Sequence, residues 1–262
     1  MRFALPTRAA IGFAFHLTHR RLLVRVAWGM GALTALVGMG GAGMLSRGGE
    51  HPPLVPWLLL VQNALAYGIA VLVAFGGATQ AFRRDRDDGV RALLRVRGQG
   101  TREYVIARFV GLLFAVMIPT VGGMMLTGGV ALAVAPKVRA LPEVARAVAV
   151  GVGFCASFSF LVTLVALAAL GARGRAGGYL VLLALFVVPD FLSPWTASLV
   201  PPAWSTLVSL PGIVGSARDA LWPGTFDGPL LVRSLAALGL VSLGLAALVR
   251  AELLRLDLER AS

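Results

Sequence analysis

Long runs of apolar residues without a single charge dominate this chain and limit what it can fold into. Residues 54–82 contain no charged side chain, and neither do residues 109–136. About 20 residues of helix, rising ~1.5 Å each, are enough to cross the ~30 Å hydrocarbon core of a bilayer. The mean hydropathy of +0.83 also argues against a soluble domain. The sequence therefore predicts an all-α integral membrane protein with several spans.

Six spans are expected within one transmembrane domain that covers residues 1–262. They are residues 23–45, 54–82, 107–135, 144–171, 176–192 and 230–250. The domain divides into an interfacial helix within 1–22, spans 1 and 2 over 23–82, a cytoplasmic loop 83–106, spans 3 to 5 over 107–192, an outer segment 193–229, and span 6 with a cytoplasmic tail over 230–262.

The outer segment 193–229 is apolar but cannot form one continuous membrane helix. It contains Pro194, Pro201, Pro202 and Pro211, and interior prolines break helices. It is also rich in tryptophan, which is typical of the membrane interface. We expect short, broken helices before the last span, which re-enter the membrane only if protein buries their backbone.

Residues 8–22 have the pattern of an amphipathic helix. At 100° per residue, Arg8, His16 and Arg20 fall on one face, while Phe13 and Leu17 fall on the other. Such a helix would lie in the cytoplasmic interface and lead into the first span. A plain basic segment preceding a membrane helix explains the same residues equally well.

Basic residues are distributed unevenly between the two ends of the expected spans. With the N-terminus inside, 18 of the 24 Lys and Arg residues fall in cytoplasmic segments. The positive-inside rule then predicts that both termini are cytoplasmic. The net charge of +12 fits these loops and acidic lipid headgroups, and no basic stripe interleaved with aromatics indicates nucleic-acid binding. Because 23 of the 24 are Arg and Ala and Gly abound, we expect a bacterial inner-membrane protein.

Sequence motifs of the common enzyme classes are absent. The chain has no H-E-x-x-H, no G-x-S-x-G and no Walker A sequence. Cys155 is the only cysteine, so neither an intrachain disulfide nor a cysteine-based metal site can form. We therefore expect no catalytic residue, metal ligand or cofactor in this chain.

Polar residues within the spans are few. Gln62, Asn63 and Tyr67 fall near the outer half of span 2. Polar groups at membrane depth need partners or a hydrated cavity, so these three are candidates for lining a translocation path. Helix–helix hydrogen bonding is the alternative interpretation.

The charge is concentrated in one loop, which reads RRDRDDGVRALLRVRGQGTREYVIAR over residues 83–108. In a helix from 88 to 97, Val90, Leu93 and Leu94 share a face, and Asp87 or Asp88 can cap its start. Glycines at 98 and 100 would end it. This pattern favours a short amphipathic helix over a merely solvated loop.

The loop resembles that of type-2 ABC transporter permeases. The shared pattern is an acidic-Arg-acidic-x-Gly sequence, a Leu-Leu helix, a turn with Thr-Arg, and a basic residue that opens span 3. Asp85 and Asp87 stand where Glu is usual, Val90 replaces a common Thr, and Gly98-Gln99-Gly100 stands where a Pro often sits. The motif covers about 25 residues, whereas the layout of interfacial helix, six spans and broken helices covers nearly the whole chain.

The resemblance implies the membrane subunit of an ABC exporter. The loop would be the coupling helix, which docks on a separate ATPase subunit that binds ATP and Mg. The residues that this role would involve are Asp85, Asp87, Asp88, Gly89, Val90, Leu93 and Leu94. A second permease copy, identical or paralogous, would complete the path, and the substrate would be a lipid, glycan, drug, peptide or cofactor. The alternatives are an ATP-independent channel or secondary transporter, and a membrane-embedded enzyme.

Overall fold

The computed structural model describes residues 8–46, 53–90, 93, 96, 100–135, 141–173, 175–196, 199, 201, 204, 207–224 and 226–258. Over these residues the regular structure is helical, with no strand. The first half contains α1 (Arg8–His19), α2 (Leu22–Leu45), α3 (Leu54–Asn63), the π-helical segment η1 (Ala64–Ala70), α4 (Val71–Ala78), α5 (Ala81–Asp87) and α7 (Thr101–Val134). The second half contains α8 (Leu141–Leu170), α9 (Arg175–Leu182), the π-helical segment η3 (Leu183–Val187), α10 (Val188–Thr196), α12 (Leu210–Asp219) and α13 (Gly228–Leu258).

Five helices in the described part of the chain are long and apolar enough to cross a membrane. They are Leu22–Leu45, Leu54–Asp87, Thr101–Val134, Leu141–Leu170 and Gly228–Leu254. These helices confirm a multi-pass helical membrane protein. The fifth expected span, 176–192, differs: its apolar helical stretch is only Ala176–Val187, within the helical segments α9, η3 and α10.

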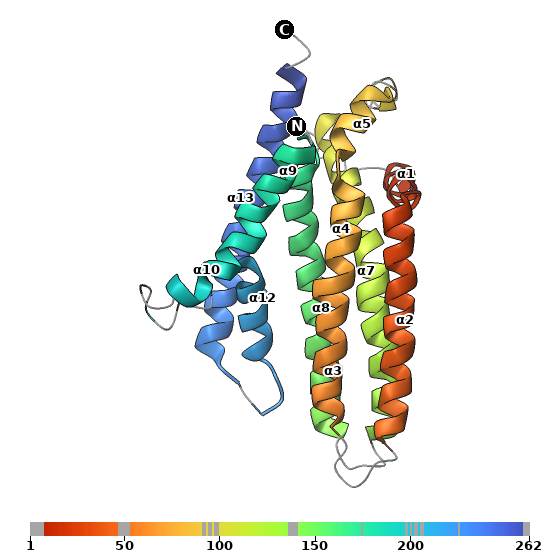
Figure 1. The fold of residues 1–262 in the computed structure, drawn as a ribbon, viewed down its shortest axis with the longest axis vertical. Coiled ribbons are helices and arrows are strands. Elements are labelled where there is room, and N and C mark those ends of the chain that lie inside the picture. The colour runs from red at the N-terminus through yellow and green to blue at the C-terminus, as the bar shows by residue number, and fades with distance from the viewer. Residues whose placement is uncertain are drawn as a thin grey trace.

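The helix α8 occupies the centre of the bundle. It contacts α3, η1, α4 and α7 on one side and α9, α12 and α13 on the other, as Figure 1 shows. Every residue from Leu161 to Leu170 is buried. A helix that is apolar on all faces has to be surrounded by other helices, so its sequence explains its position. By contrast, α13 leaves Leu235, Leu240, Leu243, Leu248 and Leu254 exposed.

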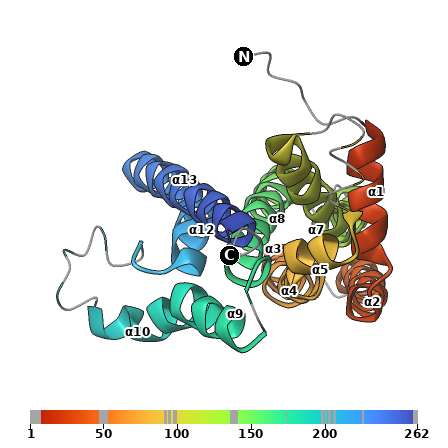
Figure 2. The same ribbon diagram turned by 90° about the horizontal axis from the view of Figure 1, so that it is seen from above.

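The helix α1 lies across one end of the bundle. Figure 1 shows it nearly end-on above α2, and Figure 2 shows it lengthwise in the plane perpendicular to the bundle axis. Residues Arg8–His19 are helical, as the sequence predicted for 8–22. The buried face is nevertheless made of Ala10, Ala14 and Thr18, while Phe13 is 45% exposed. The most deeply buried residues of α1 are therefore small, and Phe15 packs beside Trp28 while only partly buried.

Close approach of α1 to α7 depends on one glycine. A Cβ placed on Gly111 of α7 would lie 2.7 Å from the backbone N of Phe15 and 2.8 Å from Cβ of Ala14. Small residues at helix contacts let backbones come together in membrane proteins, where lipid provides no hydrophobic driving force. Gly111 is therefore the residue that lets α1 rest directly on α7.

The outer segment forms short helices, of which α12 is the best defined. Ser209 caps α12, since its hydroxyl oxygen accepts a hydrogen bond from the N–H of Gly212 at 3.0 Å. Pro211 lies in the first turn, where its missing N–H is tolerated. Ile213 and Val214 are buried, and α12 packs against α8 and α13. Its backbone is thus covered by protein, which is the condition for irregular chain at membrane depth.

Replacement of Gly111 by Ala should push α1 off the bundle. We expect a loss of about 1–3 kcal/mol, as is typical of overpacking, measured by thermal unfolding in detergent. Gly122→Ala on the same helix is the matched control, because a Cβ there meets nothing within 4 Å. The control should be neutral or should stabilise the helix by up to ~1 kcal/mol. Equal melting temperatures for the two variants would contradict this account of the α1–α7 contact.

Candidate functional site

The charged loop begins with a turn that is fixed to the end of α8. Thr79 and Gln80 separate α4 from α5, and Gln80 has a left-handed backbone with φ of 54°. Its N–H donates to the carbonyl oxygen of Leu170 at 2.8 Å, and the N–H of Phe82 donates to that of Gly171 at 2.8 Å. A left-handed residue other than glycine costs about 1–2 kcal/mol, so these bonds must stabilise it. The start of the loop is therefore held rigidly against the central helix.

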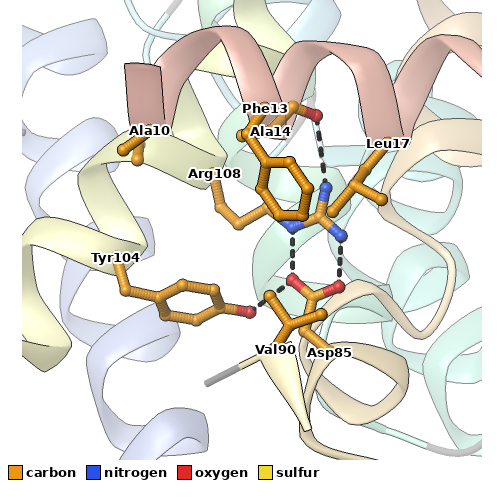
Figure 3. Close-up of a pocket in the computed structure, with 9 residues that line it drawn as sticks. Ala10, Phe13, Ala14, Leu17, Asp85, Val90, Tyr104 and Arg108 are labelled. Carbon is orange, nitrogen blue, oxygen red and sulfur yellow. Dashed lines mark hydrogen bonds and ion pairs between the residues drawn. The ribbon is translucent and has the colours of Figure 1, made fainter. Parts of the chain in front are cut away.

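A buried ion pair then joins α5 to α7. Asp85 accepts hydrogen bonds from Nε of Arg108 at 2.6 Å and from Nη2 of Arg108 at 2.5 Å. The hydroxyl of Tyr104 donates to the same carboxylate at 2.7 Å. Asp85, Arg108 and Tyr104 are each only 4% exposed. Figure 3 shows the two-pronged arrangement, with the tyrosine reaching the carboxylate from the side.

The same arginine also holds α1. Nη1 of Arg108 donates to the carbonyl oxygen of Ala14 at 3.3 Å, so the guanidinium lies between α1 and α5 (Figure 3). A carbonyl inside a helix already accepts one bond and can accept a second through its other lone pair. One side chain thus connects three elements that are far apart in sequence, namely α1, α5 and α7.

A second arginine strengthens this end of the bundle. Arg21, between α1 and α2, donates from Nη1 to the carbonyl oxygens of Gly76 at 2.9 Å and Thr79 at 2.8 Å, at the end of α4. Cations are favourable at helix C-termini, where carbonyls lack intrahelical partners. Burial, followed by the nearby charges of Arg108 and Arg84, lowers the pKa of Arg21 to about 10. The group is therefore still protonated at neutral pH and keeps its donors.

The predicted coupling residues fall into two groups. Asp85 faces inward, whereas the side chains of Asp87 and Asp88 are exposed, the former at 56% beside Arg86. Asp88 closes α5 rather than opening the next helix, since its N–H donates to the carbonyl oxygen of Arg84 at 2.8 Å. Gly89 follows with φ of +72°, a conformation that favours glycine, and turns the chain into the next segment.

The helix predicted over 88–97 begins later than expected, because Asp88 and Gly89 form a turn. Val90, Leu93 and Val96 are helical, and the N–H of Leu93 donates to the carbonyl oxygen of Gly89 at 3.1 Å. Val90 faces back, lining a small cavity of about 10 Å³ with Phe13 of α1 (Figure 3). Leu93 is 66% exposed and Val96 is 88% exposed. Leu94 lies outside the described residues.

Two candidate path residues, Asn63 at the end of α3 and Tyr67 in η1, lie beside Arg218 of α12. Oδ1 of Asn63 accepts a hydrogen bond from Nη1 of Arg218 at 2.9 Å. The guanidinium carbon lies 5.0 Å from the ring centroid of Phe154, a cation–π contact. The ring of Tyr67 packs edge-on against that of Phe154. Asn63 and Tyr67 therefore meet at one place, beside a charge that sequence analysis had assigned to an outer loop.

Gln62 is placed differently from its neighbour. Its side chain is fully buried, and within the described residues neither its amide nitrogen nor its amide oxygen has a hydrogen-bond partner. It precedes η1, and a π-helical turn within a membrane helix often marks a functional position. An unsatisfied buried amide costs about 1–3 kcal/mol, so this residue is not explained by packing alone.

Two residues of the candidate sites could not be identified from the sequence, namely Arg108 as the partner of Asp85 and Arg218 as the partner of Asn63. A charged residue within an apolar run needs a partner, and Arg108 lies seven residues after the start of α7. That rule would have suggested an acidic partner for Arg108 but would not have chosen among the aspartates of the loop. Arg218 was missed as a partner of Asn63, because prolines break up the pattern of its segment and only short, broken helices could be predicted there.

Breaking the buried pair should destabilise the protein strongly. Asp85→Asn leaves the Arg108 charge buried without a counter-ion, and such changes cost about 3–5 kcal/mol. The double variant Asp85→Leu with Arg108→Met should recover most of this loss, since two buried charges are then removed together. Asp87→Asn is the control, with an expected change of about 0–1 kcal/mol at an exposed pair. Thermal unfolding in detergent measures all three, and a double variant no more stable than the single would contradict the buried pair.

Within the described residues no group of three or more His, Cys, Asp or Glu side chains is placed to hold a metal ion. Comparisons of the chain with protein-family models, with curated proteins and with solved structures find no match. Function has to be inferred from the residues and contacts of this chain.

Proposed function

We propose that this chain is the membrane subunit of an ABC exporter, driven by a separate ATPase subunit. The observation that carries the proposal is the helical segment after α5, which presents Leu93 and Val96 to solvent at one end of the bundle. Apolar side chains exposed on a short helix at the end of the bundle suit a groove in a soluble partner. Here it stands on a loop braced by Asp85 and Arg108, so force applied to the segment reaches α1 and α7.

The arrangement of the chain ends supports a cytoplasmic position for this docking surface. α1, α5 and the C-terminal end of α13 lie at the same end of the bundle (Figure 1). Most of the arginines belong to segments at that end, which the positive-inside rule places in the cytoplasm. We also propose that α9, η3 and α10 form the fifth of six spans. Their 8, 5 and 9 residues measure ~33 Å when added together.

A secondary transporter is the second candidate, and Arg218 is the observation that favours it. An ion-coupled transporter needs an ionisable group within the bundle, and Arg218 contacts Asn63 and Phe154 there. An arginine does not release its proton at physiological pH, so it cannot serve as a proton-coupling group. It can still bind an anion. The contact therefore suits substrate recognition better than energy coupling, and the ATP-driven proposal is preferred.

Charges on the exposed face should abolish docking without unfolding the membrane domain. The double variant Leu93→Asp with Leu94→Asp removes two apolar side chains, each contributing about 1.5–3 kcal/mol when buried. We expect an inserted permease that no longer co-purifies with an ATPase and no longer stimulates its ATP hydrolysis. The measurement is co-purification in mild detergent, together with ATPase activity and thermal unfolding.

A leucine at the same end of the bundle provides the matched control. Leu254 on α13 is 55% exposed and stands between the charged residues Glu252 and Arg255. Leu254→Asp adds a similar charge away from the loop and should leave the ATPase bound. If the Leu93/Leu94 variant keeps its ATPase and full activity, the loop is not a coupling helix.

The orientation can be tested by cysteine labelling. In a Cys155→Ser background, cysteines at Glu143 and Phe226 should react with a membrane-impermeant thiol reagent in intact cells. Both positions are exposed, one in the first turn of α8 and the other just before α13, and these two helices begin at the end of the bundle away from α1 (Figure 1). Cysteines at Arg20 and Arg102 should react only after the membrane is opened. Labelling of the Arg102 position in intact cells would invert the proposed topology.

A further inference from the structure

A cavity of about 300 Å³ lies between α8, α12 and α13, in the half of the bundle remote from α1 and α5 (Figure 1). α8 contributes Gly153 and Ser157, α12 contributes Arg218, and α13 contributes Leu231 and Leu235. This volume is at the lower end of the 300–1,000 Å³ typical of small-molecule sites. The lining is almost entirely apolar apart from one guanidinium. It therefore combines a lipid-like wall with a single fixed positive charge.

Arg218 is held in a defined orientation in this cavity. Its side chain is 14% exposed, Nη1 donates to Asn63, and the guanidinium lies over the ring of Phe154. Its acidic neighbour Asp219 accepts from Nε and Nη2 at 2.7 Å but is itself 61% exposed. A guanidinium carries five N–H donors, so these contacts leave donors for another oxygen. An exposed carboxylate is also a weak competitor for an anion that enters from the cavity.

The apolar wall of the cavity includes one face of α13. Leu231, Leu235 and Leu238 line the cavity, and Leu235 is 52% exposed. In a helix that crosses the membrane, this surface faces hydrocarbon. A molecule with an anionic group at Arg218 and a hydrocarbon chain along α13 would satisfy both halves of the site.

We infer that this cavity binds an anionic amphiphile, an acidic lipid whose phosphate or carboxylate group contacts Arg218 while its chain lies against α13. The claim that the protein exports an acidic lipid rests on the proposed function. The claim that an acidic lipid binds this chain does not rest on it, because the site lies within one protomer and involves no ATPase.

The experiment counts lipids bound to the full-length chain in detergent by native mass spectrometry. Phosphatidylglycerol is compared with zwitterionic phosphatidylcholine, and inorganic phosphate is added as a soluble competitor. We expect phosphatidylglycerol to bind preferentially and phosphate to leave it in place. Two variants should weaken this binding by about tenfold or more: Arg218→Gln, which removes a charge-assisted hydrogen bond, and Gly153→Leu, which fills the cavity.

Matched variants separate the site from general effects. A Cβ on Gly153 meets nothing within 4 Å, so Gly153→Leu should fold, and Gly129→Leu on α7 is an equally open glycine outside the cavity. Arg233→Gln removes another arginine of the same half, which lies over Trp204. Both controls should bind phosphatidylglycerol normally.

Three results would overturn the inference. They are equal binding of the two lipids, displacement by phosphate, and unchanged binding in Gly153→Leu. A loss of dimer in Gly153→Leu with lipid binding intact would assign the cavity to a second copy instead. ATPase co-purification is recorded on the same samples. A chain that binds acidic lipid without any ATPase would leave this inference standing while rejecting the exporter proposal.

Discussion

The buried pair of Asp85 and Arg108 is the interaction on which the organisation of this chain depends. Two charges removed from water are tolerable only together, so their positions fix each other. Through them the loop after span 2 is tied to α7, and through Nη1 of Arg108 also to α1. A loop of that composition would otherwise be free in solvent. Here a displacement of α5 has to move two further helices or break a pair worth several kcal/mol. This stiffness is what a docking element requires if a partner is to move the membrane helices.

The other half of the bundle uses charge in the opposite way. The partners of Arg218 are the largely exposed carboxylate of Asp219 and the neutral amide of Asn63. Its carboxylate partner is therefore much more exposed to water than Asp85 is. Such a cation is oriented without being neutralised. The first arginine therefore stabilises the fold and the second remains available, although both lie in helices of a membrane protein. Their side chains differ in exposure accordingly, at 5% for Arg108 and 14% for Arg218.

The sequence predicted the parts of the structure that depend on length and composition, and failed where folding brings distant residues together. The long helices follow from uncharged runs, and the helix over Arg8–His19 follows from periodicity. The inward direction of the Asp85 side chain could not be predicted, because the three aspartates within four residues are equivalent until Arg108 is placed beside one of them. The small-residue face of α1 was also missed: periodicity identifies large apolar residues, whereas contact with Gly111 selects alanines. The contact of Arg218 with Asn63 was not predicted either, because the proline-broken segment 193–229 gives no helical register that would indicate a neighbour in α3.

The two ends are physically connected through α8 and the aromatic side chains around it. Phe158 packs against Tyr67 in η1 and against Phe186 in η3, so both π-helical segments meet the same residue. A residue inserted into an α-helix rotates the remainder of that helix by about 100°, since each residue turns the helix by 360°/3.6. Conversion of η1 to regular helix would therefore reorient Tyr67 relative to the segment that leads into α4 and the braced loop. A charge that cannot titrate, such as Arg218, has no means of driving this change, and the sequence contains no nucleotide-binding motif. In the proposed exporter, the energy for this change would come from the ATPase subunit, at the end of the bundle where Leu93 is exposed.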